Sequence, residues 1–171
     1  MSRIIHSQAD LAMRDLRLRY IPVVSTGLAI FLTLLPFIPS APLLPDFGFL
    51  MLITWRLLRP EIWTARMALG LGLLSDLVAG HPLGQAMLLW TATFLVFDLV
   101  DARLGFRDYW MDWLIAAAAL ILHAAGAWYI ALMMGSDVDF RVMLPQIGLS
   151  ILAYPIATQI VVSLDRRRLG G

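Results

Sequence analysis

Six apolar stretches alternate with short polar segments along the chain. Each stretch is long and carries few charges, which is typical of helices that lie within a lipid bilayer. The predicted membrane-crossing helices are about 20–38, 44–58, 65–79, 83–100, 110–134 and 142–164. The pattern therefore predicts an all-α integral membrane protein, built as a bundle of six transmembrane helices.

Composition supports a membrane protein and narrows the chemistry. Of the 171 residues, 60% are hydrophobic and 15% are charged, whereas soluble domains are nearer half apolar and a quarter charged. The net charge of +1 is too small to indicate a nucleic-acid partner. The absence of cysteine excludes disulfides, thiolate metal sites and a cysteine nucleophile.

Three segments follow from this pattern: a polar N-terminal segment 1–19, a membrane domain 20–165 and a basic tail 166–171. Residues 1–19 alternate arginines with apolar residues, so they predict either an amphipathic helix on the membrane surface or a cytoplasmic tail. The arginines expected at the inner surface, near anionic lipid, are Arg14, Arg17, Arg19, Arg166, Arg167 and Arg168.

The distribution of arginine predicts the orientation. With six crossings, twelve of the thirteen basic residues fall on one side and only Arg141 falls on the other, so both termini are expected in the cytoplasm. The stretches 44–58 and 65–79 are shorter than the roughly 20 residues that a bilayer favours. A re-entrant hairpin with four crossings is the alternative. It separates the arginines less well, so six crossings are preferred.

The stretch 70–84, GLGLLSDLVAGHPLG, places a carboxylate among small residues. Small residues allow helices to pack closely, and a carboxylate in a membrane needs a partner or water. We expect Asp76 to accept hydrogen bonds from the 80–84 turn or a neighbouring helix. The alternative is an outward-facing contact for a partner or a small ligand. The helix face comprises Ala65, Ala68, Gly72, Asp76 and Ala79.

The depths of the polar residues argue against catalysis. At 1.5 Å per residue, Asp76 and Asp98 are about 15–20 Å apart along the membrane normal, too far to act as a pair. Asp76, His123 and Gln159 are likewise expected at different heights. His123 is predicted to be a neutral, hydrogen-bonded packing residue, and His81 a loop residue. No catalytic residue, metal site or cofactor is expected.

Other polar residues are candidates for pairing or for partner contacts. Arg56 follows Trp55 near the inner interface, at the depth of Asp98, so an Arg56–Asp98 pair is predicted. Pro155 predicts a kink beside Tyr154, either packed or opening a groove. The candidate partner contacts are Asp76, Trp55, Arg56 and Tyr154.

The pattern G-L-x-x-D-L-x-x-G-x-P-L-G resembles the signature of the MreD family, the rod shape-determining membrane proteins of bacteria. Trp55 and Arg56 upstream add to the resemblance. The matching residues are Gly72, Leu73, Asp76, Leu77, Gly80, Pro82, Leu83 and Gly84.

This resemblance implies a multi-pass protein of the bacterial inner membrane and a non-catalytic scaffold of the cell-elongation complex. Such a subunit would bind MreC and, through it, MreB, RodA and a penicillin-binding transpeptidase, and so support lateral peptidoglycan synthesis. MreD-like proteins are also similar in size and span number to the substrate-binding subunits of energy-coupling-factor transporters. A small-molecule-binding transporter subunit is therefore the alternative.

Overall fold

The computed structural model describes residues 8–34, 44–103 and 108–169, and in these ranges all regular structure is helical. Three short 3-10 segments, η1 (Leu32–Leu34), η2 (Pro60–Ile62) and η3 (Phe140–Met143), lie between the main helices. The main helices are α1 (Gln8–Phe31), α2 (Phe47–Leu58), α3 (Ala65–Ala79), α4 (Gln85–Arg103), α5 (Tyr109–Met133) and α6 (Leu144–Leu169).

Each predicted apolar stretch overlaps one of these helices, because the apolar runs are bounded by proline, glycine and charged residues. The first stretch differs most, since α1 starts at Gln8 and no break in the backbone separates segment 8–19 from the apolar run. The side chains of Arg14, Arg17 and Arg19 lie outside the described residues, as do segments 1–7, 35–43 and 170–171. The surface role of segment 1–19 stays a prediction.

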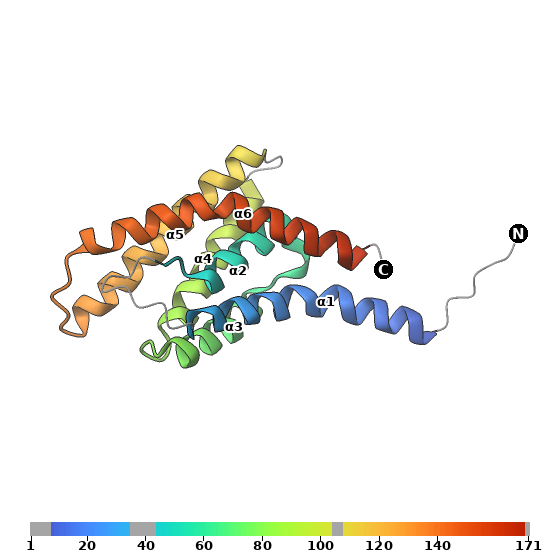
Figure 1. The fold of residues 1–171 in the computed structure, drawn as a ribbon, viewed down its shortest axis with the longest axis horizontal. Helices are drawn as coiled ribbons and strands as arrows, with labels where there is room; N and C mark the ends of the chain where they lie inside the picture. Colours follow the sequence, from blue (N-terminus) through green and yellow to red (C-terminus); the bar gives the residue numbers. More distant parts are fainter. Residues whose placement is uncertain (1–7, 35–43, 104–107, 170–171) are drawn as a thin grey trace, which may run out of the picture.

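The core is organised around α2. Nine of its twelve residues are buried, as expected for a helix that is apolar on every side. It lies between α1 and α6 in Figure 1 and also contacts α5. Trp55 and Phe49 are fully buried on α2, and the Trp55 indole donates a hydrogen bond of 2.9 Å to the Ser25 hydroxyl of α1.

Three helical segments are long and apolar enough to cross a membrane: Gln85–Arg103, Tyr109–Met133 and Phe140–Arg168. Their outward faces carry large exposed apolar side chains, among them Leu95, Leu122 and Leu152, which suit lipid contact. By contrast, α2 and α3 have 12 and 15 residues and reach only about 18 and 22 Å. The fold indicates a membrane protein, while six crossings stay a prediction. In Figure 1, α1 begins and α6 ends at the same end of the bundle.

Candidate functional site

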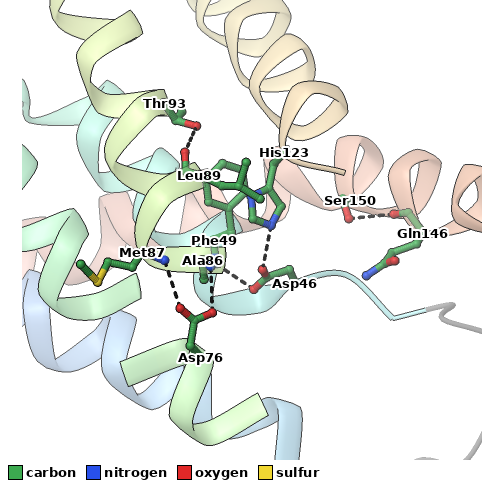
Figure 2. Close-up of polar contacts among 10 residues, drawn as sticks. All are labelled: Asp46, Phe49, Asp76, Ala86, Met87, Leu89, Thr93, His123, Gln146 and Ser150. Atoms are coloured by element: carbon green, nitrogen blue, oxygen red, sulfur yellow. Dashed lines mark hydrogen bonds and ion pairs between the residues drawn. The ribbon is translucent and has the colours of Figure 1, made fainter. Parts of the chain in front are cut away.

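Asp76 joins α3 to the beginning of α4. Its Oδ1 accepts a hydrogen bond from the Ala86 N–H at 2.8 Å, and its Oδ2 accepts from Gly84 and Met87 at 3.0 and 3.3 Å. The first N–H groups of a helix have no partner within it, so a carboxylate from α3 caps α4 and lies at the positive end of its dipole. Figure 2 shows this cap. The hydrogen bonds predicted for Asp76 are confirmed.

Gly72 allows the two helices to approach closely enough for that cap. A Cβ atom at Gly72 would lie 2.6 Å from the Met87 Cα and 2.8 Å from the Met87 nitrogen. These are backbone atoms that cannot rotate away. Gly72 lies one turn before Asp76 on α3, so the contact and the cap share one helix face.

The turn between α3 and α4 requires two glycines. Gly80 ends α3 in the left-handed conformation with φ of 70°, and its N–H donates to the Asp76 carbonyl. Gly84 has φ of 96° directly before α4. Side chains other than hydrogen disfavour both conformations. The motif residues Gly72, Asp76, Gly80, Pro82 and Gly84 therefore build one packed unit, the α3–α4 hairpin.

Arg56 of α2 forms buried ion pairs with α4. Its guanidinium contacts Asp98 at 2.5 Å and Asp101 at 2.8 Å, and it lies 5.7 Å from the centroid of the Phe94 ring. The predicted Arg56–Asp98 pair is confirmed. The structure adds a second acid to this pair, Asp101, which lies three residues further along α4 on the same helix face.

A second charged group connects the end of α2 to the end of α6. The Arg59 guanidinium donates to Asp165 Oδ2 at 2.7 and 3.0 Å, and Arg168 contacts Asp165 Oδ1 at 2.7 Å. The hydrogen bonds with Asp165 raise the pKa of Arg59 above its usual value. Arg166 and Arg167 are exposed, whereas Arg168 is buried, within 6.0 Å of the centroid of the Trp55 ring. The expectation that Arg168 faces lipid thus differs from its position in the structure.

The candidate partner contacts all lie inside the bundle. Asp76, Trp55, Arg56 and Tyr154 are at most 3% exposed. Pro155 lies within the continuous helix α6, and Tyr154 beside it is packed in the core. Their role in partner binding stays a prediction, and any direct contact would require the bundle to open.

Asp46 and His123 form a polar contact between α2 and α5. Asp46 caps α2 by accepting the Phe49 N–H at 2.9 Å, and its Oδ2 lies 3.4 Å from His123 Nε2. The His123 ring stacks on Phe49 with 4.1 Å between centroids. The sequence analysis did not single out Asp46 as a candidate. The signal that could have identified it is an aspartate directly before an apolar run, which is typical of a helix N-cap.

A cavity of about 700 Å³ opens beside this contact. It is bounded by η1, the end of α3, the beginnings of α2, α4 and α6, and the second half of α5. Its polar lining consists of Thr33, Asp46, Ser75, His81, Gln85, His123, Ser136, Gln146 and Ser150.

This cavity brings together Asp46 and His123, which the sequence did not place side by side. Asp76 does not line it, so the expected difference in height among Asp76, His123 and Gln159 stays a prediction. Because α2 is short, its first turn lies at the level of His123, in the middle of α5, and Asp46 reaches that level. Gln159 is exposed on the second half of α6 and takes no part. Within the described ranges, no group of three or more potential ligands could hold a metal ion.

These features define an all-helical membrane protein with a glycine-rich hairpin capped by aspartate and a polar cavity. The chain belongs to the MreD family: the model described as rod shape-determining protein MreD matches residues 15–166 of the 171. Membership gives the chain a role in rod shape determination. No curated protein and no solved structure matches the chain.

Proposed function

We propose that this protein is a non-catalytic scaffold subunit of the bacterial cell-elongation complex. In this role it binds MreC in the inner membrane and, through MreC, supports MreB, RodA and a penicillin-binding transpeptidase in lateral peptidoglycan synthesis. The family match over residues 15–166 carries the proposal. Both termini are expected in the cytoplasm, from the arginine distribution.

A groove between α4 and α5 supports a scaffold role. It has a volume of about 270 Å³ and an almost entirely apolar lining that includes Ala92, Ala118 and Ala119. Small residues let a partner's membrane helix approach closely. The groove is therefore the surface that we propose for the single membrane helix of MreC.

Depletion and complementation test the scaffold role. Cells depleted of the protein are expected to become round, and the wild-type gene to restore rods. In the same cells, Ala118→Leu is expected to reduce co-purification of MreC, while Ala117→Leu, outside the groove lining, is expected to leave it intact. Unchanged rod shape on depletion would contradict the elongation role. Equal co-purification by both variants would contradict only the groove.

The cavity favours a second candidate, a small-molecule-binding membrane subunit of a transporter. Its volume of about 700 Å³ is typical of ligand pockets, which span roughly 300–1,000 Å³. Protein purified from membranes with a bound small molecule, released on denaturation and identified by mass spectrometry, would support this candidate. Purification with a single-span partner and no ligand would support the scaffold role.

A further inference from the structure

The cavity beside Asp46 has a lining that discriminates by charge. Asp46 is the sole carboxylate among the lining residues, and none of them is lysine or arginine. The other polar groups are imidazoles, amides and hydroxyls, which are neutral or weakly basic. An anionic ligand would meet a carboxylate with no permanent cation to offset it. A cationic ligand could form an ion pair with the Asp46 carboxylate.

The geometry of Asp46 leaves part of its carboxylate available. Oδ1 accepts the Phe49 N–H, while Oδ2 faces His123 Nε2 at 3.4 Å. That separation is longer than the 2.7–2.9 Å typical of a charge-assisted hydrogen bond, so Oδ2 is not saturated. The Asp46 side chain is 22% exposed, and a group in the cavity can therefore reach it.

Other polar side chains line the cavity near this carboxylate. Figure 2 shows the Gln146 side chain of α6 directed toward Asp46 with its amide nitrogen, and His123 of α5 on another side. Ser75 of α3 also lines the cavity and is only 3% exposed, and its hydroxyl oxygen is a further acceptor in the lining.

Apolar side chains form another part of the wall. Val78 of α3, Leu120 and Ala127 of α5, and Ile147 of α6 line it. A ligand that fills this volume thus needs one polar end near Asp46 and a hydrophobic body.

We propose that the cavity binds a primary ammonium group carried on an apolar body. An ammonium offers three donors and no acceptor, which matches the Asp46 carboxylate, and the Ser75 hydroxyl oxygen is another acceptor in the lining. The ammonium belongs either to a free amphipathic amine or to the headgroup of phosphatidylethanolamine. This site goes beyond the scaffold role and does not depend on it.

Binding of matched probes tests the charge preference. The full-length protein in phosphatidylglycerol nanodiscs, which contain no amine, is titrated with 2-phenylethylamine, 2-phenylethanol and 3-phenylpropionate. Only the amine is expected to bind saturably, and the alcohol at least about tenfold more weakly, because it lacks a charge-assisted hydrogen bond. Equal binding of amine and alcohol, tighter binding of the carboxylate, or no saturable binding of the amine would overturn the proposal.

Variants locate the site. Asp46→Asn keeps a good N-cap acceptor but removes the charge, and amine affinity is expected to fall at least about tenfold. Asp139→Asn is the matched control, because Asp139 caps η3 through the Arg141 N–H and does not line the cavity. Ala127→Phe fills the cavity without altering Asp46 and is also expected to abolish binding. Unchanged affinity in folded Asp46→Asn or Ala127→Phe protein would overturn the proposal.

The lipid composition distinguishes the two sources of the ammonium. Replacing half of the phosphatidylglycerol with phosphatidylethanolamine is expected to weaken phenylethylamine binding more than replacing the same half with phosphatidylcholine, which lowers the surface charge equally, if the headgroup occupies the cavity. Equal affinity in the two lipid mixtures would identify a free amine as the occupant. Both results support an ammonium site, because both require saturable amine binding that depends on Asp46.

Discussion

At the scale of single residues, Asp76 illustrates how a membrane protein uses a buried carboxylate. It is 1% exposed, yet three backbone N–H groups at the beginning of α4 donate to it. The charge therefore stabilises a helix junction, and sequence reasoning predicted this role because the acid lies four residues before a glycine turn. What the sequence could not show was that the donors come from three different residues after the turn.

Replacing Asp76 by alanine is expected to destabilise the protein. The buried Ala86 N–H and the partly buried N–H groups of Gly84 and Met87 would lose their acceptor, at a cost of about 1–3 kcal/mol for each group that finds no water. Thermal unfolding of the detergent-solubilised protein, followed by circular dichroism, measures the effect. Asp139→Ala, at an exposed cap, is the control and should shift the midpoint much less. Equal shifts would contradict the capping role.

The isosteric change Asp76→Asn separates packing from partner binding. An amide oxygen accepts fewer of the three hydrogen bonds and has no charge, so a smaller loss of stability than in Asp76→Ala is expected. MreC co-purification should fall only in proportion to the amount of folded protein. Normal stability with complete loss of MreC would instead identify Asp76 as a partner contact.

Gly72 and Gly70 provide a matched pair within α3. Gly72→Ala places a methyl group against the Met87 backbone, and overpacking of this kind costs about 1–3 kcal/mol. Gly70→Ala meets nothing within 4 Å and is expected to stabilise the helix by about 0.5–1 kcal/mol. Midpoints of thermal unfolding that move in opposite directions would bear this out. A shift in the same direction for both would contradict the close approach of α3 and α4.

At the scale of elements, α2 is a short apolar helix whose charged end is neutralised by its neighbours. Arg56 forms ion pairs with Asp98 and Asp101 of α4, while Arg59 forms an ion pair with Asp165 of α6. Arg56 lies in the last turn of α2, Arg59 directly follows the helix, and the two bind different partners. These two separate sets of ion pairs hold α4 and α6 in position around α2.

The two acids that bind Arg56 are expected to compensate for each other. Asp98→Asn or Asp101→Asn alone should have a modest effect, because one carboxylate remains. The double variant leaves a buried guanidinium without a counter-charge, which costs about 3–5 kcal/mol. Thermal unfolding of the single and double variants measures this non-additivity, and adding Arg56→Met should restore part of the loss. Additive effects would contradict a shared site.

At the scale of the whole molecule, the sequence predicted the features that depend on residues close together in the chain. The apolar runs located the helices, and the 70–84 motif predicted the hairpin, because turn residues and helix caps act within a few positions. The Asp46–His123 contact was missed, since it depends on how deep the short helix α2 begins relative to α5. The burial of Arg168 was missed for a similar reason, because it follows from the packing of α6 on α2.

The number of crossings is also a property of the whole molecule, and thiol labelling can determine it. The chain has no cysteine, so a single introduced cysteine reports one position. His81→Cys is expected to react with a membrane-impermeant maleimide in intact cells. Glu61→Cys is expected to react only after permeabilisation. Labelling of the Glu61→Cys variant in intact cells would establish the re-entrant hairpin with four crossings instead.

The position of α2 has a consequence for biogenesis. Its C-terminal partner Asp165 lies 106 residues further along the chain than Arg59, so the core cannot close until the ribosome has delivered the final helix. Until then, α2, which is too short to cross the lipid by itself, is held by the translocon or a chaperone. A nascent chain truncated before α6 would lack Asp165, the acid that binds Arg59. Quality-control proteases could recognise such a chain by this missing ion pair and degrade it.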